Sequence, residues 1–133
     1  MTVKLYKRSE LHAPLQAALE ELWVALEARK PYIIVEEVIS KRFIQYYGSR
    51  ERRPILDIPR GQLSSALAPG TMEAHGFRYV PFKGFESQAG SYQIACGSVA
   101  SGAKWGCDAL RGALGFLEDF YEFTIETGGR PMD

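Results

Sequence analysis

Histidine and its neighbours are the first residues to test for chemistry. His12 and His75 are the only histidines, and Glu73 stands close before the second one. A carboxylate that orients an imidazole is an arrangement used in general acid–base catalysis. A solvated turn explains the same residues without chemistry, and Ser98 and Ser101 lack the G-x-S-x-G setting of an activated serine. We therefore assign no catalytic residue.

Carboxylates and thiols are the next candidates, because both can bind metals. Glu36 and Glu37 precede Asp57 on what we expect to be a neighbouring strand, but adjacent strand residues point to opposite faces, so a salt-bridged sheet surface is the better interpretation. Cys96 and Cys107 have no histidine or second cysteine pair near them and fit no zinc pattern. We expect two reduced, buried thiols, no metal and no cofactor.

A basic segment spans residues 41–60 and contains two adjacent tyrosines, Tyr46 and Tyr47. Arginine binds phosphate and aromatic rings stack on bases, so a nucleic-acid-binding module is one alternative. Against it, Glu51 interrupts the segment and the net charge is zero, with 16 basic and 16 acidic residues. We favour a protein contact, and predict that the partner-binding residues are Tyr46, Tyr47, Arg50, Arg52, Arg53 and Trp105.

A glycine-containing segment at residues 97–104 leads into an expected helix. Gly97 and Gly102 have the glycine spacing of a P-loop, but Ala103 stands where the motif needs lysine, and Trp105 follows Lys104 where it needs Ser or Thr. The motif therefore fails at the residues that perform the chemistry. A small-anion or nucleotide site at this helix start is a second alternative, since helix N-termini attract anions.

Two long helices and several strands must position these residues. Apolar residues at helical spacing predict one helix from Leu11 or Pro14 to Arg29, which Pro31 ends, and another from Val99 or Ser101 to Phe120. A two-turn helix within 62–68 and a shorter one over 72–75 are expected between them. β-branched and aromatic runs predict strands near residues 32–36, 42–47, 54–59, 77–82, 92–96 and 121–127, with a tail from Gly128. The first two runs predict either two strands or one long bent ribbon.

These elements predict one α+β domain over residues 1–133, with a core at about 10–127 and an antiparallel sheet packed against the two long helices. A chain of 133 residues needs no disulfide or metal for stability. Its N-terminus has no secretory signal, and its longest apolar run, residues 32–35, is far too short to cross a membrane. We expect a cytoplasmic protein with no membrane partner.

The order of elements resembles the type III secretion chaperone-like superfamily, including its YbjN-type and TY-Chap branches. The similarity lies in the amphipathic helix before residues 32–35, in Arg42-Phe43-Ile44-Gln45-Tyr46, in residues 55–59, and in the leucine-to-glycine-aromatic stretch that ends at Gly76-Phe77. Such chaperones are typically acidic, whereas this chain is neutral. The resemblance implies a small cytosolic protein, often a homodimer, that binds a polypeptide, and it transfers no catalytic residue.

From these observations we expect a non-enzymatic protein-binding module that acts as a chaperone, an adaptor or a toxin-neutralising partner. A protein partner is the leading expectation, and a homodimer is one candidate assembly. Nucleic acid is the weaker alternative because the chain is neutral overall.

Overall fold

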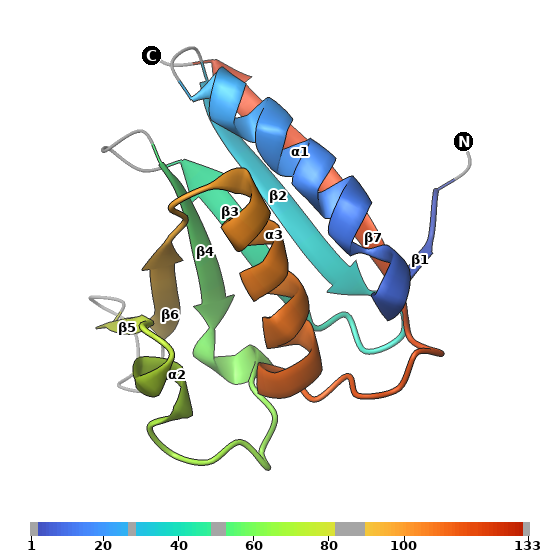
Figure 1. Cartoon of the computed structure of the whole chain (residues 1–133), viewed down its shortest axis with the longest axis vertical. Helices are drawn as coiled ribbons and strands as arrows, with labels where there is room; N and C mark the ends of the chain where they lie inside the picture. Colours follow the sequence, from blue (N-terminus) through green and yellow to red (C-terminus); the bar gives the residue numbers. More distant parts are fainter. Residues whose placement is uncertain (1–2, 27–28, 49–52, 82–89, 132–133) are drawn as a thin grey trace.

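A single antiparallel sheet organises the molecule in the computed structural model, which describes residues 3–26, 29–48, 53–81 and 90–131 (Figure 1). The seven strands lie in the order β1-β7-β2-β3-β4-β6-β5. This confirms an α+β fold with an antiparallel sheet. The strands are β1 (Tyr6–Lys7), β2 (Arg29–Glu37), β3 (Phe43–Gly48), β4 (Pro54–Pro59), β5 (Arg78–Pro81), β6 (Gly90–Ala95) and β7 (Glu122–Pro131).

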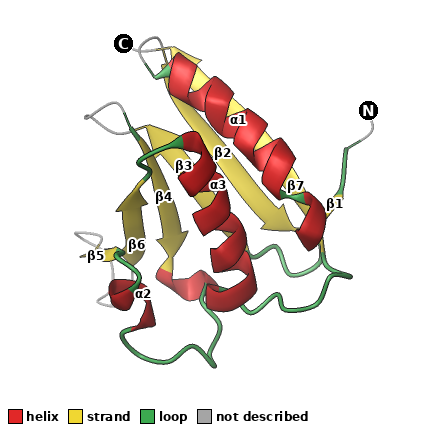
Figure 2. Cartoon of the chain, in the orientation of Figure 1, coloured by secondary structure: helices red, strands yellow, loops and turns green. Residues whose placement is uncertain are grey.

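The helices α1 (His12–Ala25) and α3 (Val99–Asp108) pack on one face of this sheet, whereas the short α2 (Thr71–Ala74) lies near β5 and β6 (Figure 2). Strand residues alternate between the two faces. Those that face the helices form the core with the helix leucines, and they include Ile33, Val35, Ile44, Tyr46, Leu56, Ile58 and Phe123. Among the described residues no helix covers the opposite face, which we call the open face.

The first predicted helix is confirmed over the 14 residues His12–Ala25. Leu15, Leu19 and Leu22 are buried on the side that faces the sheet, as their spacing indicates. The prediction that it reaches Arg29 is wrong, because Arg29 opens β2 and pairs with Pro131 of β7. Pro31 disfavours a helical backbone at the residue before it, which favours this early start of the strand.

The second predicted helix is shorter than expected. α3 spans ten residues and ends at Asp108, and one π-helical segment, Ala109–Ala113, follows it. Gly115 has a φ of 86°, and the Phe116 N–H donates to the Leu110 carbonyl at 3.0 Å. A glycine in the left-handed region is a usual helix end, so the predicted continuation to Phe120 is wrong.

The last strand is longer than expected. β7 pairs with β2 from Phe123, opposite Glu37, to Pro131, opposite Arg29. The predicted tail from Gly128 is therefore wrong, and a strand also extends before residue 10, where β1 pairs with the start of β7.

The region between β4 and β6 follows the prediction only in part. The helix expected within residues 62–68 is wrong, because the only helical turn there is the 3₁₀ turn Arg60–Gln62. The short helix is confirmed as α2, which begins at Thr71. Most of the loop predicted over residues 83–90 lies outside the described residues.

Candidate functional site

Tyr46 and Tyr47 are neighbours on β3 and point to opposite faces of the sheet. Tyr46 is fully buried, and its hydroxyl donates a hydrogen bond to the Gly102 carbonyl of α3 at 2.7 Å. Burial is the largest cause that raises the pKa of Tyr46 well above its usual value, and the charges of Cys96 and Cys107 raise it further. The expectation that Tyr46 is exposed for a partner is therefore wrong, since its side chain joins α3 to the sheet.

Tyr47 lies on the open face within a polar network that no sequence motif indicated. Its hydroxyl donates to Asp57 Oδ2 at 2.8 Å, and Gln45 Nε2 donates to Asp57 Oδ1 at 3.0 Å. Gln93 Nε2 donates to both Asp57 Oδ2 and the Tyr47 oxygen. Burial, and then the hydrogen bond to Asp57, raise the pKa of Tyr47. The ring is half-buried, and its hydroxyl already has partners.

The described cations of the basic segment are not all available to a partner. Arg42 donates to the carbonyls of Gln62 and Leu114, and its guanidinium lies 4.9 Å from the centre of the Phe116 ring. It therefore joins β3 to the chain after α3. Arg53 is exposed, whereas Arg50 and Arg52 lie outside the described residues.

The carboxylates that the sequence placed near one another are separated. Glu37 accepts hydrogen bonds from the Ile39 and Ser40 N–H groups at 2.9 and 2.8 Å. Burial is the largest single influence and raises the pKa of Glu37, but these two bonds, a further hydrogen bond from the Ser40 side chain and the charge of Lys41 together leave the pKa below its usual value. Asp57 belongs to the Tyr47 network, and over the described ranges no three His, Cys, Asp or Glu residues are grouped to hold a metal ion.

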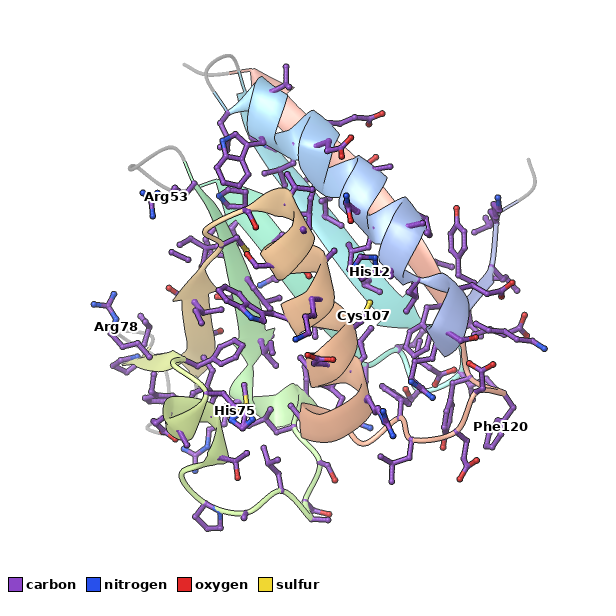
Figure 3. All side chains as sticks on the ribbon, viewed as in Figure 1. His12, Arg53, His75, Arg78, Cys107 and Phe120 are labelled. Carbon is purple, nitrogen blue, oxygen red and sulfur yellow. The ribbon has the colours of Figure 1, made fainter. Side chains whose placement is uncertain are left out.

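The two histidines lie on different elements, His12 at the start of α1 and His75 after α2 (Figure 3). Both are exposed. Glu73 interacts with the Tyr92 hydroxyl, whose pKa is raised by burial and then by Glu73. Burial also raises the pKa of Cys96 and of Cys107 to about 11, so both thiols are protonated at neutral pH and are weak nucleophiles.

The start of α3, the predicted anion site, is capped by the chain itself. The Ser101 N–H donates to Ser98 Oγ at 3.1 Å, and the Ser98 N–H donates to Ser101 Oγ at the same distance. This reciprocal pair is a capping box. It occupies one of the N–H groups that an anion would use, and the anion site stays a prediction.

A hollow lies elsewhere, between α3 and the segment around α2. It has a volume of about 610 Å³, within the range of ligand-binding clefts. We call it the α2–α3 groove. Its lining comprises Leu67, Thr71, Met72, Ala74, His75 and Phe77 on one side and Lys104, Trp105, Asp108, Ala109, Gly112 and Ala113 on the other.

Trp105 is the one predicted partner-binding residue in this groove. It is half-buried and projects from α3 beside the small residues Ala109, Gly112 and Ala113, which leave the space open. The π-helical segment supplies these small residues, and such segments occur often at functional sites. The sequence showed the tryptophan and the small residues, but the opposite wall comes from a part of the chain 28 or more residues away, and no local pattern indicates that contact.

No family model matches the chain, and neither the curated proteins nor the solved structures contain a significant match to it. The resemblance to secretion chaperones therefore stays a prediction. In the described part of the chain, none of the helices has the length and apolar character needed to cross a membrane.

Proposed function

We propose that this chain is a cytoplasmic, non-enzymatic protein-binding module that holds an apolar segment of a polypeptide partner in the α2–α3 groove. The observation that carries the proposal is the partly exposed Trp105 beside an open hollow of about 610 Å³. Tryptophan is the residue type most enriched at the energetic centres of protein interfaces.

The composition of the groove supports a polypeptide rather than a charged small molecule. Met72, Phe77 and Trp105 line the hollow together with the small residues Ala109, Gly112 and Ala113. The polar groups at its edge carry both signs, with Lys104 and Asp108 one helical turn apart on α3. Such a pair selects for neither an anion nor a cation, whereas an apolar centre with a mixed polar rim is the usual anatomy of a protein interface.

A chaperone, an adaptor and a toxin-neutralising protein would use the same groove, because each needs only a complementary surface. The resemblance to secretion chaperones implies a polypeptide partner and carries over no catalytic residue. Burial of Trp105 by a partner is the interaction expected in all three cases.

The test uses the purified full chain as bait in an extract of its native host, with half of the sample treated with nuclease. A protein recovered equally from both halves is then purified and its affinity for the bait is measured directly by calorimetry. We expect Trp105→Ala to weaken this binding at least about tenfold, the equivalent of about 1.4 kcal/mol.

Two further variants make the result specific to the groove. Gly112→Phe fills the hollow from a position where a Cβ meets nothing within 4 Å, so it should block binding and leave the core intact. Phe120→Ala removes an aromatic ring that is 68% exposed and does not line the groove (Figure 3), and should leave the affinity unchanged. If all three variants bound the partner with equal affinity, the groove would not be the binding site. If the partner were recovered only together with nucleic acid, nucleic-acid binding by the basic segment would be favoured instead.

A further inference from the structure

The outer edge of β7 is the second surface with unused binding capacity. β1 pairs only with Glu122 and Phe123, at the start of this ten-residue strand. From Thr124 to Pro131 β7 pairs with β2 on its inner side, and no described strand lies on its outer side. Unpaired backbone along a strand edge is a template for an additional strand.

The hydrogen-bonding direction along β7 can be followed from its first residue. The Val38 N–H donates to the Glu122 carbonyl at 3.0 Å, so the groups of Glu122 point toward the β2 side. Backbone groups alternate in direction along an antiparallel strand. The N–H and C=O groups of Ile125, Thr127 and Gly129 therefore point to the outer edge, and the side chains of Ile125 and Thr127 lie on the helix side.

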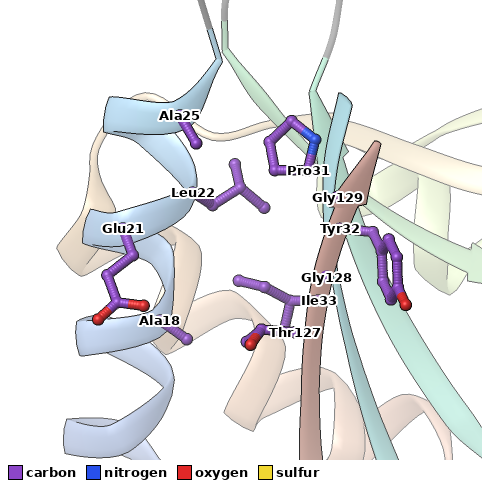
Figure 4. Close-up of a pocket in the computed structure, with 10 residues that line it drawn as sticks. All are labelled: Ala18, Glu21, Leu22, Ala25, Pro31, Tyr32, Ile33, Thr127, Gly128 and Gly129. Carbon is purple, nitrogen blue, oxygen red and sulfur yellow. The ribbon is translucent and has the colours of Figure 1, made fainter. Parts of the chain in front are cut away.

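A pocket of about 220 Å³ lies beside this edge, between α1 and the ends of β2 and β7 (Figure 4). Ala18, Leu22 and Ala25 line it from α1, and Thr127 and Gly129 line it from β7. A cavity of about 150 Å³ holds a benzene molecule, so this pocket has room for an aliphatic side chain. Every second side chain of an added strand would lie on the helix side of the sheet, as the Thr127 side chain does, and would therefore point toward this pocket.

The acidic side chains that the structure describes near the edge favour one kind of strand. Glu21 stands on α1 at the pocket, and Glu126 is exposed on the open face of β7. Glu36 lies on the same face, opposite Thr124. A second copy paired through β7 about Thr127 would place the two Glu126 side chains diagonally opposite, about 7–8 Å apart, where like charges repel. A basic strand gains from the same charges.

We propose that the outer edge of β7, from Ile125 to Gly129, binds an extended basic segment of a partner polypeptide as an added strand. Alternate apolar side chains enter the pocket beside α1, and basic side chains on the other face meet Glu126 of the neighbouring strand. This site is independent of the α2–α3 groove, because the two sites share no lining residue.

The test uses a seven-residue synthetic peptide of alternating valine and lysine, added to the full-length protein at up to about 1 mM. We expect NMR to show protection of the Ile125, Thr127 and Gly129 amides from exchange. In an antiparallel pairing with β7, the valines on the helix side would also make the backbone bonds to β7. N-methylation of the valine nitrogens should therefore abolish binding, whereas N-methylation of the lysine nitrogens should leave it intact.

Protein variants test the same edge from the other side. Thr127→Pro removes an outward N–H at an edge position where proline is tolerated, and should weaken binding at least about tenfold, whereas Thr127→Ser should not. Glu126→Lys should also weaken binding, and Trp105→Ala should have no effect, which separates this site from the groove. Equal binding of the two N-methylated peptides, no protection of these amides, or protection by self-association without peptide would each overturn the proposal.

Discussion

The two faces of the sheet solve the burial of polar groups in different ways, and Tyr46 and Tyr47 show the difference at adjacent positions. On the helix side, Tyr46 is enclosed by α3, and its one hydroxyl bond goes to the Gly102 carbonyl. On the open face, side chains alone bury Asp57 to 2% exposure and supply its donors. The helix-covered face is stabilised by the close approach of the α3 backbone to the sheet, and the open face is stabilised by a network of polar side chains.

This comparison predicts that the two faces respond to different substitutions. Where the backbone of a helix lies close to the sheet, one added methyl group disrupts the packing, because a packed interior has no space for it. A polar network fails when its shared acceptor is removed, because several donors lose their partner together.

Gly106→Ala should produce the largest loss of stability. The added Cβ would overlap the Tyr46 hydroxyl and also approach Leu15, so we expect a loss of about 3 kcal/mol in the free energy of unfolding, measured by urea denaturation. Gly112→Ala is the matched control, because its Cβ meets nothing within 4 Å, and it should be neutral or stabilising by up to about 1 kcal/mol. Similar losses in both variants would contradict the close packing of α3 on Tyr46.

Asp57→Ala should cost about 2 kcal/mol, because Tyr47, Gln45 and Gln93 lose an acceptor that is itself buried. Chemical denaturation of the variant measures the loss. Glu126→Ala changes an exposed carboxylate on the same face and should alter stability by less than about 0.5 kcal/mol. If the two substitutions had equal effects, the network would not stabilise the open face.

Removal of the two hydroxyl groups gives a direct comparison of the faces at smaller magnitude. Tyr46→Phe leaves the buried Gly102 carbonyl without this donor and should cost about 1.5 kcal/mol. Tyr47→Phe should cost about 0.5–1 kcal/mol, because water can reach a half-buried position. Thermal and urea unfolding of both variants measure the difference. A larger loss for Tyr47→Phe would contradict the expectation that the hydroxyl on the helix-covered face contributes more to stability.

A rise in pH from neutral to about 9 should produce the smallest loss in the free energy of unfolding. Burial raises the pKa of Cys96 from 9.0 to about 11, so above pH 9 the unfolded state binds fewer protons than the folded state. The resulting stability is present below about pH 9 and is lost as pH rises toward 11, with a loss of roughly 0.4 kcal/mol from Cys96 at pH 9. Unfolding measured from pH 7 to 10 should show this decline, and Cys96→Ala should remove the Cys96 share of it, whereas the share of Cys107, whose pKa burial also raises to about 11, should remain.

Local patterns predicted much of the fold because they depend on nearby residues. The leucine spacing of α1 and the β-branched and aromatic runs of β3 and β4 indicated these elements, and Pro54–Pro59 matches its predicted range. The prediction of α3 failed at Gly115, where a left-handed backbone conformation ends the helical turn. The candidate site was predictable only through Trp105, since Met72 and Phe77 reach it from a distant part of the chain.

The sequence by itself determined that Tyr46 and Tyr47 face opposite ways, because side chains alternate along any strand. Only the tertiary structure decided which of the two is buried, since that depends on where α1 and α3 pack. The same holds for β7, whose strand pattern is local, whereas its place beside β2 and its unpaired outer edge result from non-local pairing. Local periodicity determines the element, and long-range packing determines which of its surfaces is left for a partner.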